Sequence, residues 1–139
     1  MRASPTTRAN FRGSVLFACT IAAIAVPALA ADDLCGRPRE TPEALFNRLT
    51  KTEKLPEAFR DKAYVTINDA AKATIWSFTV AGHPAHPAVV CRHPVETGGK
   101  LSIDMGIQCG ASDDACEQLA RGFEGLNAKL LKDAESKAQ

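Results

Sequence analysis

The chain has 139 residues, and its 17 Lys and Arg nearly balance its 16 Asp and Glu. This charge excludes the dense basic surface with which proteins bind nucleic acid or anionic membranes. The length suits a single small domain with one hydrophobic core. We therefore expect neither nucleic acid nor a membrane surface as a partner.

Residues 1–30 have the pattern of a secretory signal peptide. Three arginines precede an apolar run at residues 15–26, and the small-residue sequence Ala28-Leu29-Ala30 supplies a cleavage site. The run is shorter than the roughly 20 residues of a membrane-spanning helix, and no later segment comes near that length. We expect cleavage before Ala31 and a periplasmic or secreted mature chain without a transmembrane segment. A lipoprotein signal at Cys19 is the weaker interpretation, because cleavage there would leave an apolar start.

Cleavage changes the charge and the number of cysteines. Residues 1–30 hold three arginines and no acid, so 14 basic and 16 acidic side chains remain, a net charge of −2. They also hold Cys19, which leaves an even number of cysteines in the mature chain. In a small exported domain an even number predicts two disulfides, and no Cys-x-x-Cys pair indicates redox or zinc chemistry. The remaining cysteines are Cys35, Cys91, Cys109 and Cys116.

A helix is predicted over residues 41–53, after a polar arm at 31–40. Thr41 is suited to cap the helix, and Pro42 is suited to its first position. Residues 57–62, which follow a Leu-Pro pair, predict a further short turn of helix. The apolar face of the longer helix carries Leu45, Phe46 and Leu49.

Two pairs of strands follow. Residues 63–67 and 73–80 are rich in β-branched and aromatic side chains, which predicts two antiparallel strands. Residues 87–96 and 100–109 predict a second hairpin, joined by Thr97-Gly98-Gly99. Apolar and polar residues alternate most regularly in the last strand. One of its faces carries Leu101, Ile103, Met105, Ile107 and Cys109, and the other carries Ser102, Asp104, Gly106 and Gln108.

The C-terminal segment has the period of an amphipathic helix. Ser112 is suited to cap it, and Asp113 and Asp114 follow where the helix dipole favours negative charge. The apolar stripe of this helix needs a partner, and the apolar face of the sheet supplies one. The sequence therefore predicts one α+β domain over residues 31–139, in the order α-β-β-β-β-α, with an antiparallel sheet of about four strands. The stripe consists of Cys116, Leu119, Ala120, Phe123, Leu126 and Leu130.

The predicted hairpin favours one of the three disulfide pairings. Cys109 falls opposite residue 87 or 88, several residues from Cys91, and the Cα atoms of a disulfide must lie within about 7 Å. A direct bridge between these two cysteines is therefore disfavoured. The short loop after Cys109 favours a bridge to Cys116, which leaves Cys35 to pair with Cys91. The rival pairing, Cys35 with Cys109 and Cys91 with Cys116, stays open.

All three histidines lie between residues 82 and 93, and prolines follow His83 and His86. A proline holds the residue before it extended and lacks an amide hydrogen, so we expect a stiff, exposed connection that delays strand pairing until Ala88. His83 and His86 are candidates for contact with a partner protein. The alternative is that His83, His86 and His93 converge on copper or zinc. The spacing matches no recognised metal motif.

No recognised catalytic motif accompanies these features. The sequence has no G-x-S-x-G, no H-E-x-x-H and no glycine-rich phosphate loop, so we expect neither an enzyme nor a cofactor. It favours a non-enzymatic exported module that binds another extracytoplasmic protein, as an envelope accessory factor, an inhibitor or an immunity-type protein. The alternative function is a periplasmic copper- or zinc-binding protein that uses the histidine segment.

Overall fold

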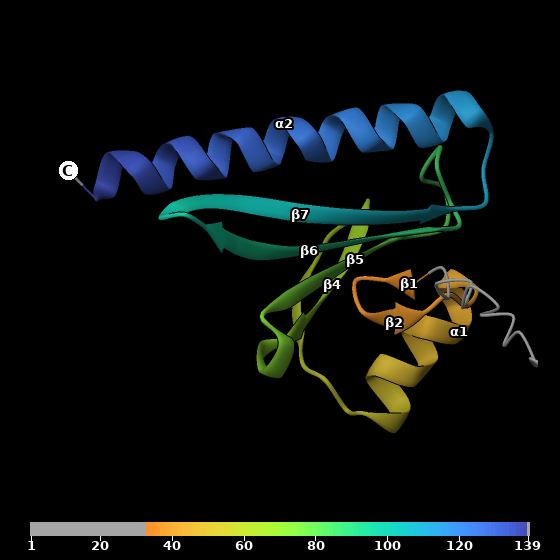
Figure 1. The fold of residues 1–139 in the computed structure, drawn as a ribbon. Helices are drawn as coiled ribbons and strands as arrows, with labels where there is room; N and C mark the ends of the chain where they lie inside the picture. The colour runs from red at the N-terminus through yellow and green to blue at the C-terminus, as the bar shows by residue number, and fades with distance from the viewer. Residues whose placement is uncertain (1–32, 139) are drawn as a thin grey trace, which may run out of the picture.

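The computed structural model describes residues 33–138 of the protein. The expected signal peptide, its cleavage site and Cys19 lie outside the described residues. The fold is α+β, as predicted, with helical elements on both sides of one sheet (Figure 1). No helix among residues 33–138 is both long and apolar enough to cross a membrane.

The main sheet is antiparallel throughout and has five strands, one more than predicted. Neighbours in the sequence are neighbours in the sheet, in the order β3-β4-β5-β6-β7. A short 3-10 turn, Ala70–Lys72, connects β4 to β5. The strands are β3, Glu57–Arg60; β4, Tyr64–Asp69; β5, Thr74–Thr79; β6, Ala88–Thr97; and β7, Lys100–Cys109.

The prediction of a helical turn at residues 57–62 is wrong, because residues 57–60 form β3. This strand pairs only with β4, where Phe59 lies opposite Thr66 and Arg60 lies opposite Val65. A single helical turn is too short to be stable by itself, whereas pairing satisfies backbone groups along a whole edge. Tertiary contact therefore decides the conformation of these residues.

The arm at residues 31–40 also contains two short strands, which the sequence does not predict. β1, Asp33–Leu34, and β2, Arg37–Pro38, form a small antiparallel hairpin. Its two-residue turn places Cys35 at φ 50° and Gly36 at φ 75°. Both angles are positive, as the tightest hairpin turns require. The hairpin buries Leu34 against the main sheet, so the arm contributes to the core.

The β6–β7 hairpin has the predicted register. Thr97 pairs with Lys100 across the turn Gly98-Gly99, and Ala88 pairs with Cys109 at the other end. Both glycines have positive φ angles, 60° and 76°, which favour glycine at these two positions. β5 pairs with β6 only as far as Arg92. The distal half of the hairpin therefore extends beyond the rest of the sheet (Figure 1).

The larger core lies on the side of the sheet that α1 covers. α1, Pro42–Asn47, is capped by Thr41, whose side chain accepts a hydrogen bond from the Ala44 amide as predicted, and it continues into a π-helical turn η1, Arg48–Thr52. The ring of Phe46 packs edge-on against Phe78, with 5.1 Å between centroids. This core consists of Leu34, Leu45, Leu49, Val65, Ile67, Trp76, Phe78, Val89 and Cys91.

A buried arginine ties together the elements of that side. Arg37 donates two hydrogen bonds to Glu53, at 2.6 and 2.8 Å, and one to Asp69, at 2.8 Å. Its guanidinium lies over the ring of Trp76, 5.7 Å from the centroid. The hydrogen bonds from Arg37 hold the pKa of the Glu53 carboxyl below its ordinary value. Because the charges come from β2, from the residue that follows η1 and from β4, the cluster fixes the N-terminal hairpin against the sheet.

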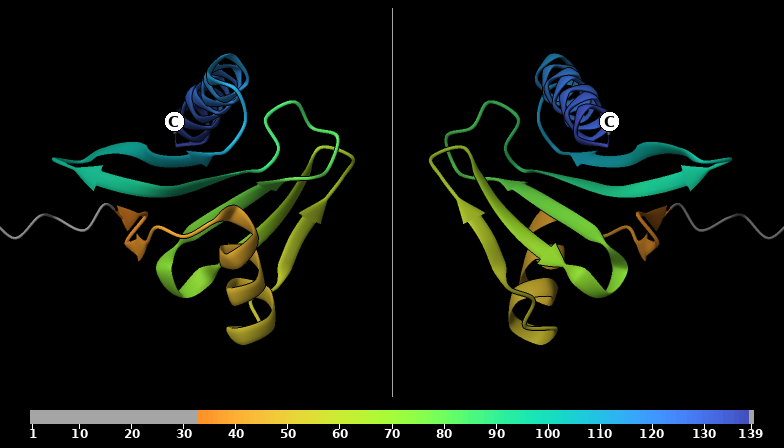
Figure 2. Two further views of the ribbon diagram at one scale, coloured as in Figure 1. Left: turned by 90° about the vertical axis from the view of Figure 1, so that its right-hand side faces the viewer. Right: turned by 90° about the vertical axis from the view of Figure 1, so that its left-hand side faces the viewer.

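α2, Asp113–Lys137, packs on the opposite side of the sheet, along β6 and β7 (Figure 2). Ser112 caps it, accepting a hydrogen bond from the Ala115 amide. Although the helix has 25 residues, it buries few of them, and Leu126 and Leu130 of the predicted stripe are 41% and 44% exposed. The buried residues of this second core are Ala85, Ala88, Val90, Leu119 and Phe123.

The two disulfides have the favoured pairing. Cys35 bonds to Cys91 with 6.3 Å between Cα atoms, and Cys109 bonds to Cys116 with 5.8 Å. The first joins the β1–β2 hairpin to β6, and the second joins the end of β7 to the first turn of α2. The protein therefore has one disulfide on each side of the sheet.

Candidate functional site

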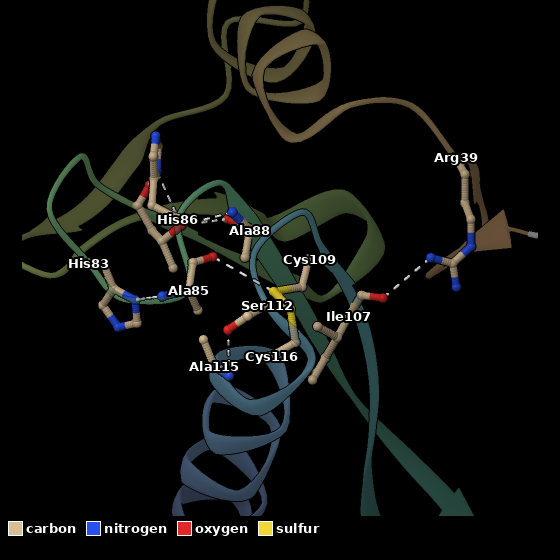
Figure 3. The surroundings of a disulfide bond; sticks show 11 residues. Arg39, His83, Ala85, His86, Ala88, Ile107, Cys109, Ser112, Ala115 and Cys116 are labelled. Atoms are coloured by element: carbon tan, nitrogen blue, oxygen red, sulfur yellow. Dashed lines mark hydrogen bonds between the residues drawn. A yellow bond between two sulfur atoms is a disulfide. The ribbon is translucent and has the colours of Figure 1, made fainter.

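The histidine loop, residues 80–87, connects β5 to β6 at one end of the sheet, near the disulfide Cys109–Cys116 (Figure 3). Several contacts hold its backbone. The His86 amide donates to the His83 carbonyl at 2.9 Å, and the Gly110 amide donates to the Pro87 carbonyl at 2.8 Å. Ala85 is buried, and its carbonyl oxygen lies 3.7 Å from Cys109 Sγ. The loop is therefore held by its neighbours and mostly exposed, as the sequence predicts, with Ala85 as its buried residue.

His83 is half-buried and uses both ring nitrogens within the protein. Its Nδ1 accepts a hydrogen bond from the Ala85 amide at 3.0 Å, and its Nε2 lies 3.0 Å from the Tyr64 hydroxyl. In the neutral ring, Nε2 therefore carries the hydrogen and donates it to Tyr64. The two rings are in contact, with centroids 5.0 Å apart. Burial raises the pKa of Tyr64, which keeps its hydroxyl protonated.

His86 is exposed and has one ring nitrogen toward solvent. Its Nδ1 lies 2.9 Å from the Thr79 carbonyl oxygen, which can only accept, so Nδ1 carries the hydrogen and donates it. The Thr79 hydroxyl in turn bonds to both backbone groups of Ala88. This arrangement fixes the plane of the imidazole. Nε2 of the neutral ring is left as an acceptor that a partner can reach.

The structure does not bring the third histidine to the loop. His93 lies on β6, five residues beyond Ala88, which corresponds to about 16 Å along a strand. Its Nε2 is 3.9 Å from an Asp104 carboxylate oxygen on the paired strand. Among residues 33–138, no group of three or more His, Cys, Asp or Glu side chains is placed to hold a metal ion. A shared copper or zinc site would therefore require rearrangement of the chain.

An apolar pocket of about 320 Å³ opens beside His86, between the histidine loop, α1 and the edge strand β3. Phe46, Val65 and Phe78 line it with apolar surface, and the exposed side chains of Glu43, Arg60 and His86 contribute polar groups. We call this hollow the His86 pocket. Its full lining is Pro42, Glu43, Phe46, Arg60, Val65, Phe78, Thr79, His86, Pro87 and Ala88.

Arg60 and Glu57 form an ion pair at the β3 side of the His86 pocket. Arg60 donates two hydrogen bonds to Glu57, at 2.8 and 2.6 Å, from Nε and Nη2. The bond from Arg60 lowers the pKa of Glu57, and the same pair raises the pKa of Arg60. Both groups are therefore charged near neutral pH, and the bidentate geometry orients the guanidinium.

Of the residues that line this pocket, only His86 is predicted from the sequence as a site residue. Phe46 and Phe78 are recognisable in the sequence as apolar residues of predicted elements, so nothing distinguishes them from core. Glu43 is explained by the helix dipole, and Arg60 falls in a segment that was assigned to a helix. Only the packing of α1 against β3–β5 brings these side chains to one place.

No protein-family model matches the sequence, no curated protein is significantly similar to it, and no solved structure matches its fold significantly. The site must therefore be interpreted from its own geometry.

Proposed function

We propose that the protein is a non-enzymatic extracytoplasmic module that binds another protein through the His86 pocket. The observation that carries the proposal is an apolar hollow with oriented polar groups at its edge, placed beside a loop whose backbone is held on several sides. A held loop loses little conformational entropy when a partner binds. The two disulfides are consistent with an oxidising compartment outside the cytoplasm.

The size of the hollow suits an anchor side chain. A volume of about 320 Å³ lies at the low end of the roughly 300–1,000 Å³ typical of ligand pockets. Protein interfaces take much of their affinity from a few apolar or aromatic side chains seated in such pockets. The polar groups carry both signs, because Glu43 stands on the α1 side and Arg60 on the β3 side. This mixture favours a polypeptide, with donors and acceptors on its backbone, over an ion of one sign.

The edge strand gives the partner a second point of attachment. β3 is the first strand of the sheet and pairs on one side only, with β4. All four of its residues are exposed, and Phe59 is 54% exposed. An extended segment of a partner can add to such an edge through backbone hydrogen bonds and place a side chain in an adjacent pocket. Arg60 would contact both parts of that segment.

The test begins with capture of envelope proteins on the exported, purified protein and then compares variants. His86→Ala and Arg60→Ala remove polar groups of the His86 pocket. Their matched controls are His93→Ala, a histidine on β6 outside the pocket, and Arg121→Ala, an exposed arginine that pairs with a glutamate as Arg60 does. We expect each pocket variant to weaken binding of the captured protein by about tenfold, or 1.4 kcal/mol, and each control to bind as wild type. Equal binding by all four variants would contradict the proposal.

Binding of copper or zinc is the alternative function that the sequence suggests. No contact among the described histidines supports it. A metal bound by His83 would have to replace one hydrogen bond of its ring, either the one to the Ala85 amide or the one to the Tyr64 hydroxyl. Native mass spectrometry of the purified protein with each metal tests it directly. A stoichiometric complex that His83→Ala and His86→Ala abolish would favour this function over protein binding.

A further inference from the structure

The last strand of the sheet, β7, has an open outer edge of unusual length. It contains ten residues and pairs on one side only, with β6. An unpaired edge of this kind exposes a row of backbone donors and acceptors that can template another strand. Lys100 and Asp104 are exposed along it, and Leu101 is 45% exposed although it is apolar.

The turn of the hairpin decides which backbone groups of β7 are available. In a two-residue hairpin, the pair that flanks the turn is hydrogen-bonded, and hydrogen-bonded pairs then alternate along the strands. Thr97 and Lys100 flank the turn. The backbone groups of the even-numbered residues of β7 therefore bond to β6, and those of the odd-numbered residues point outward, away from β6. Ile107 agrees with this assignment, since its carbonyl oxygen accepts a hydrogen bond from Arg39 Nη1 at 3.3 Å.

The Arg39 contact also limits the open edge. Arg39 occupies the carbonyl of Ile107, which is the next outward-facing residue after Met105. The stretch that can accept a new strand therefore runs from Lys100 to Met105. Leu101, Ile103 and Met105 supply its outward backbone groups.

This stretch is complementary to itself when two copies run antiparallel. A two-fold axis at Ser102 places Lys100 of one copy opposite Asp104 of the other, twice. It also places Leu101 opposite Ile103, and both of these residues have outward backbone groups. Directly opposed side chains of opposite charge, and directly opposed apolar side chains, are the pairs that stabilise antiparallel strands.

Neighbouring registers lack this match. An axis one residue further along, at Ile103, sets Asp104 opposite Ser102 and leaves Lys100 opposite Gly106. An axis at Asp104 sets the two Asp104 carboxylates against each other, which is unfavourable. The charges therefore select the register centred on Ser102.

We propose that the protein forms a two-fold symmetric dimer in which the β7 strands of two copies pair antiparallel about Ser102. The two sheets then join into one continuous sheet, and the exposed Leu101 side chains are covered by Ile103 of the other copy. The pairing removes the long open edge that each copy has alone. It uses the edge opposite β3, so it leaves the His86 pocket accessible and does not depend on the function proposed for that pocket.

Site-specific cross-linking tests the register. In Ser102→Cys, exported as the full chain, the two introduced thiols lie directly opposite each other and should form an intermolecular disulfide. The control is Asp104→Cys, whose thiols would be about 13 Å apart along the strands in this register, beyond the roughly 7 Å between Cα atoms that a disulfide permits. We expect a covalent dimer on non-reducing gels for the first variant alone. No covalent dimer from Ser102→Cys, or equal amounts from both variants, would overturn the proposal.

Charge exchange tests the same contact without a new cysteine. Lys100→Glu places acids opposite each other at two symmetric points, and we expect at least a tenfold weaker dimer in sedimentation velocity. Asp104→Lys should have the same effect by bringing lysines together. The combined variant Lys100→Glu/Asp104→Lys restores opposite charges and should dimerise within about threefold of wild type. A wild-type protein that stays monomeric at every concentration, or single variants that dimerise as well as wild type, would overturn the proposal.

Discussion

The two sides of the sheet are built differently. On the α1 side, Trp76 and several leucines are fully buried, and Arg37 joins three elements through paired charges. On the α2 side, a long helix contributes only Leu119, Phe123 and Asn127 as buried residues. We therefore expect the α1 side to provide most of the stability, because the α2 side is attached at fewer points. The difference predicts that equivalent changes on the two sides have unequal costs.

Truncation of a core side chain on the α1 side should have the largest effect. Trp76 is fully buried, and we expect Trp76→Ala to lower the free energy of unfolding by about 3–5 kcal/mol. A small domain has only about 5–15 kcal/mol in total, so much of the variant should be unfolded at 37 °C. Leu126→Ala on α2 is the control, and it should change stability by no more than about 0.5 kcal/mol. Urea denaturation measures both, and a loss for Leu126→Ala as large as that for Trp76→Ala would contradict the difference between the two sides.

The sequence predicts the α2 side of the fold better than it predicts the origin of stability on the α1 side. The alternation from Leu101 to Cys109 and the Gly98-Gly99 turn are local signals, and they give the observed register. Arg37 is different, because its partners Glu53 and Asp69 are 16 and 32 residues away in the sequence. No short-range pattern in the sequence indicates that Arg37 pairs with these two residues. For the same reason the sequence predicts a helical turn where β3 forms, since the pairing of β3 with β4 is tertiary.

Removal of each disulfide measures how much each side of the sheet depends on its covalent bond. Cys35–Cys91 closes a span of 56 residues and Cys109–Cys116 a span of 7. The loss of loop-closure entropy in the unfolded chain corresponds to about 4 kcal/mol for the first and about 2.5 kcal/mol for the second. Replacing both cysteines of each bridge by serine, followed by urea denaturation, measures the two values. A larger loss for the shorter bridge would show that α2 depends on its disulfide more than the span predicts.

The candidate site was predictable only in part. Two of the three histidines do lie in one loop, and His86 reaches solvent as expected. What the sequence could not supply is the environment of each ring. Tyr64, which takes the Nε2 hydrogen of His83, lies 19 residues earlier on β4. The sequence predicts that replacing both histidines together changes stability by no more than about 0.5 kcal/mol, as exposed substitutions usually do. Because His83 contacts Tyr64, the structure leads us to expect a larger loss.

The smallest predicted effect is a difference in stability between the His83 and His86 variants. His83→Ala leaves the Ala85 amide and the Tyr64 hydroxyl without their ring partner, so we expect a loss of about 1–2 kcal/mol. His86→Ala should cost about 0.5 kcal/mol, because its ring is exposed and makes its contacts at the end of β5. Thermal unfolding at fixed pH measures both. In a Tyr64→Phe background the hydroxyl is already absent, and His83→Ala should then cost about 0.5–1 kcal/mol less. If the cost of His83→Ala is the same in both backgrounds, the bond to Tyr64 contributes nothing. The cost of His83→Ala would then come from its other contacts, such as the bond that Nδ1 accepts from the Ala85 amide.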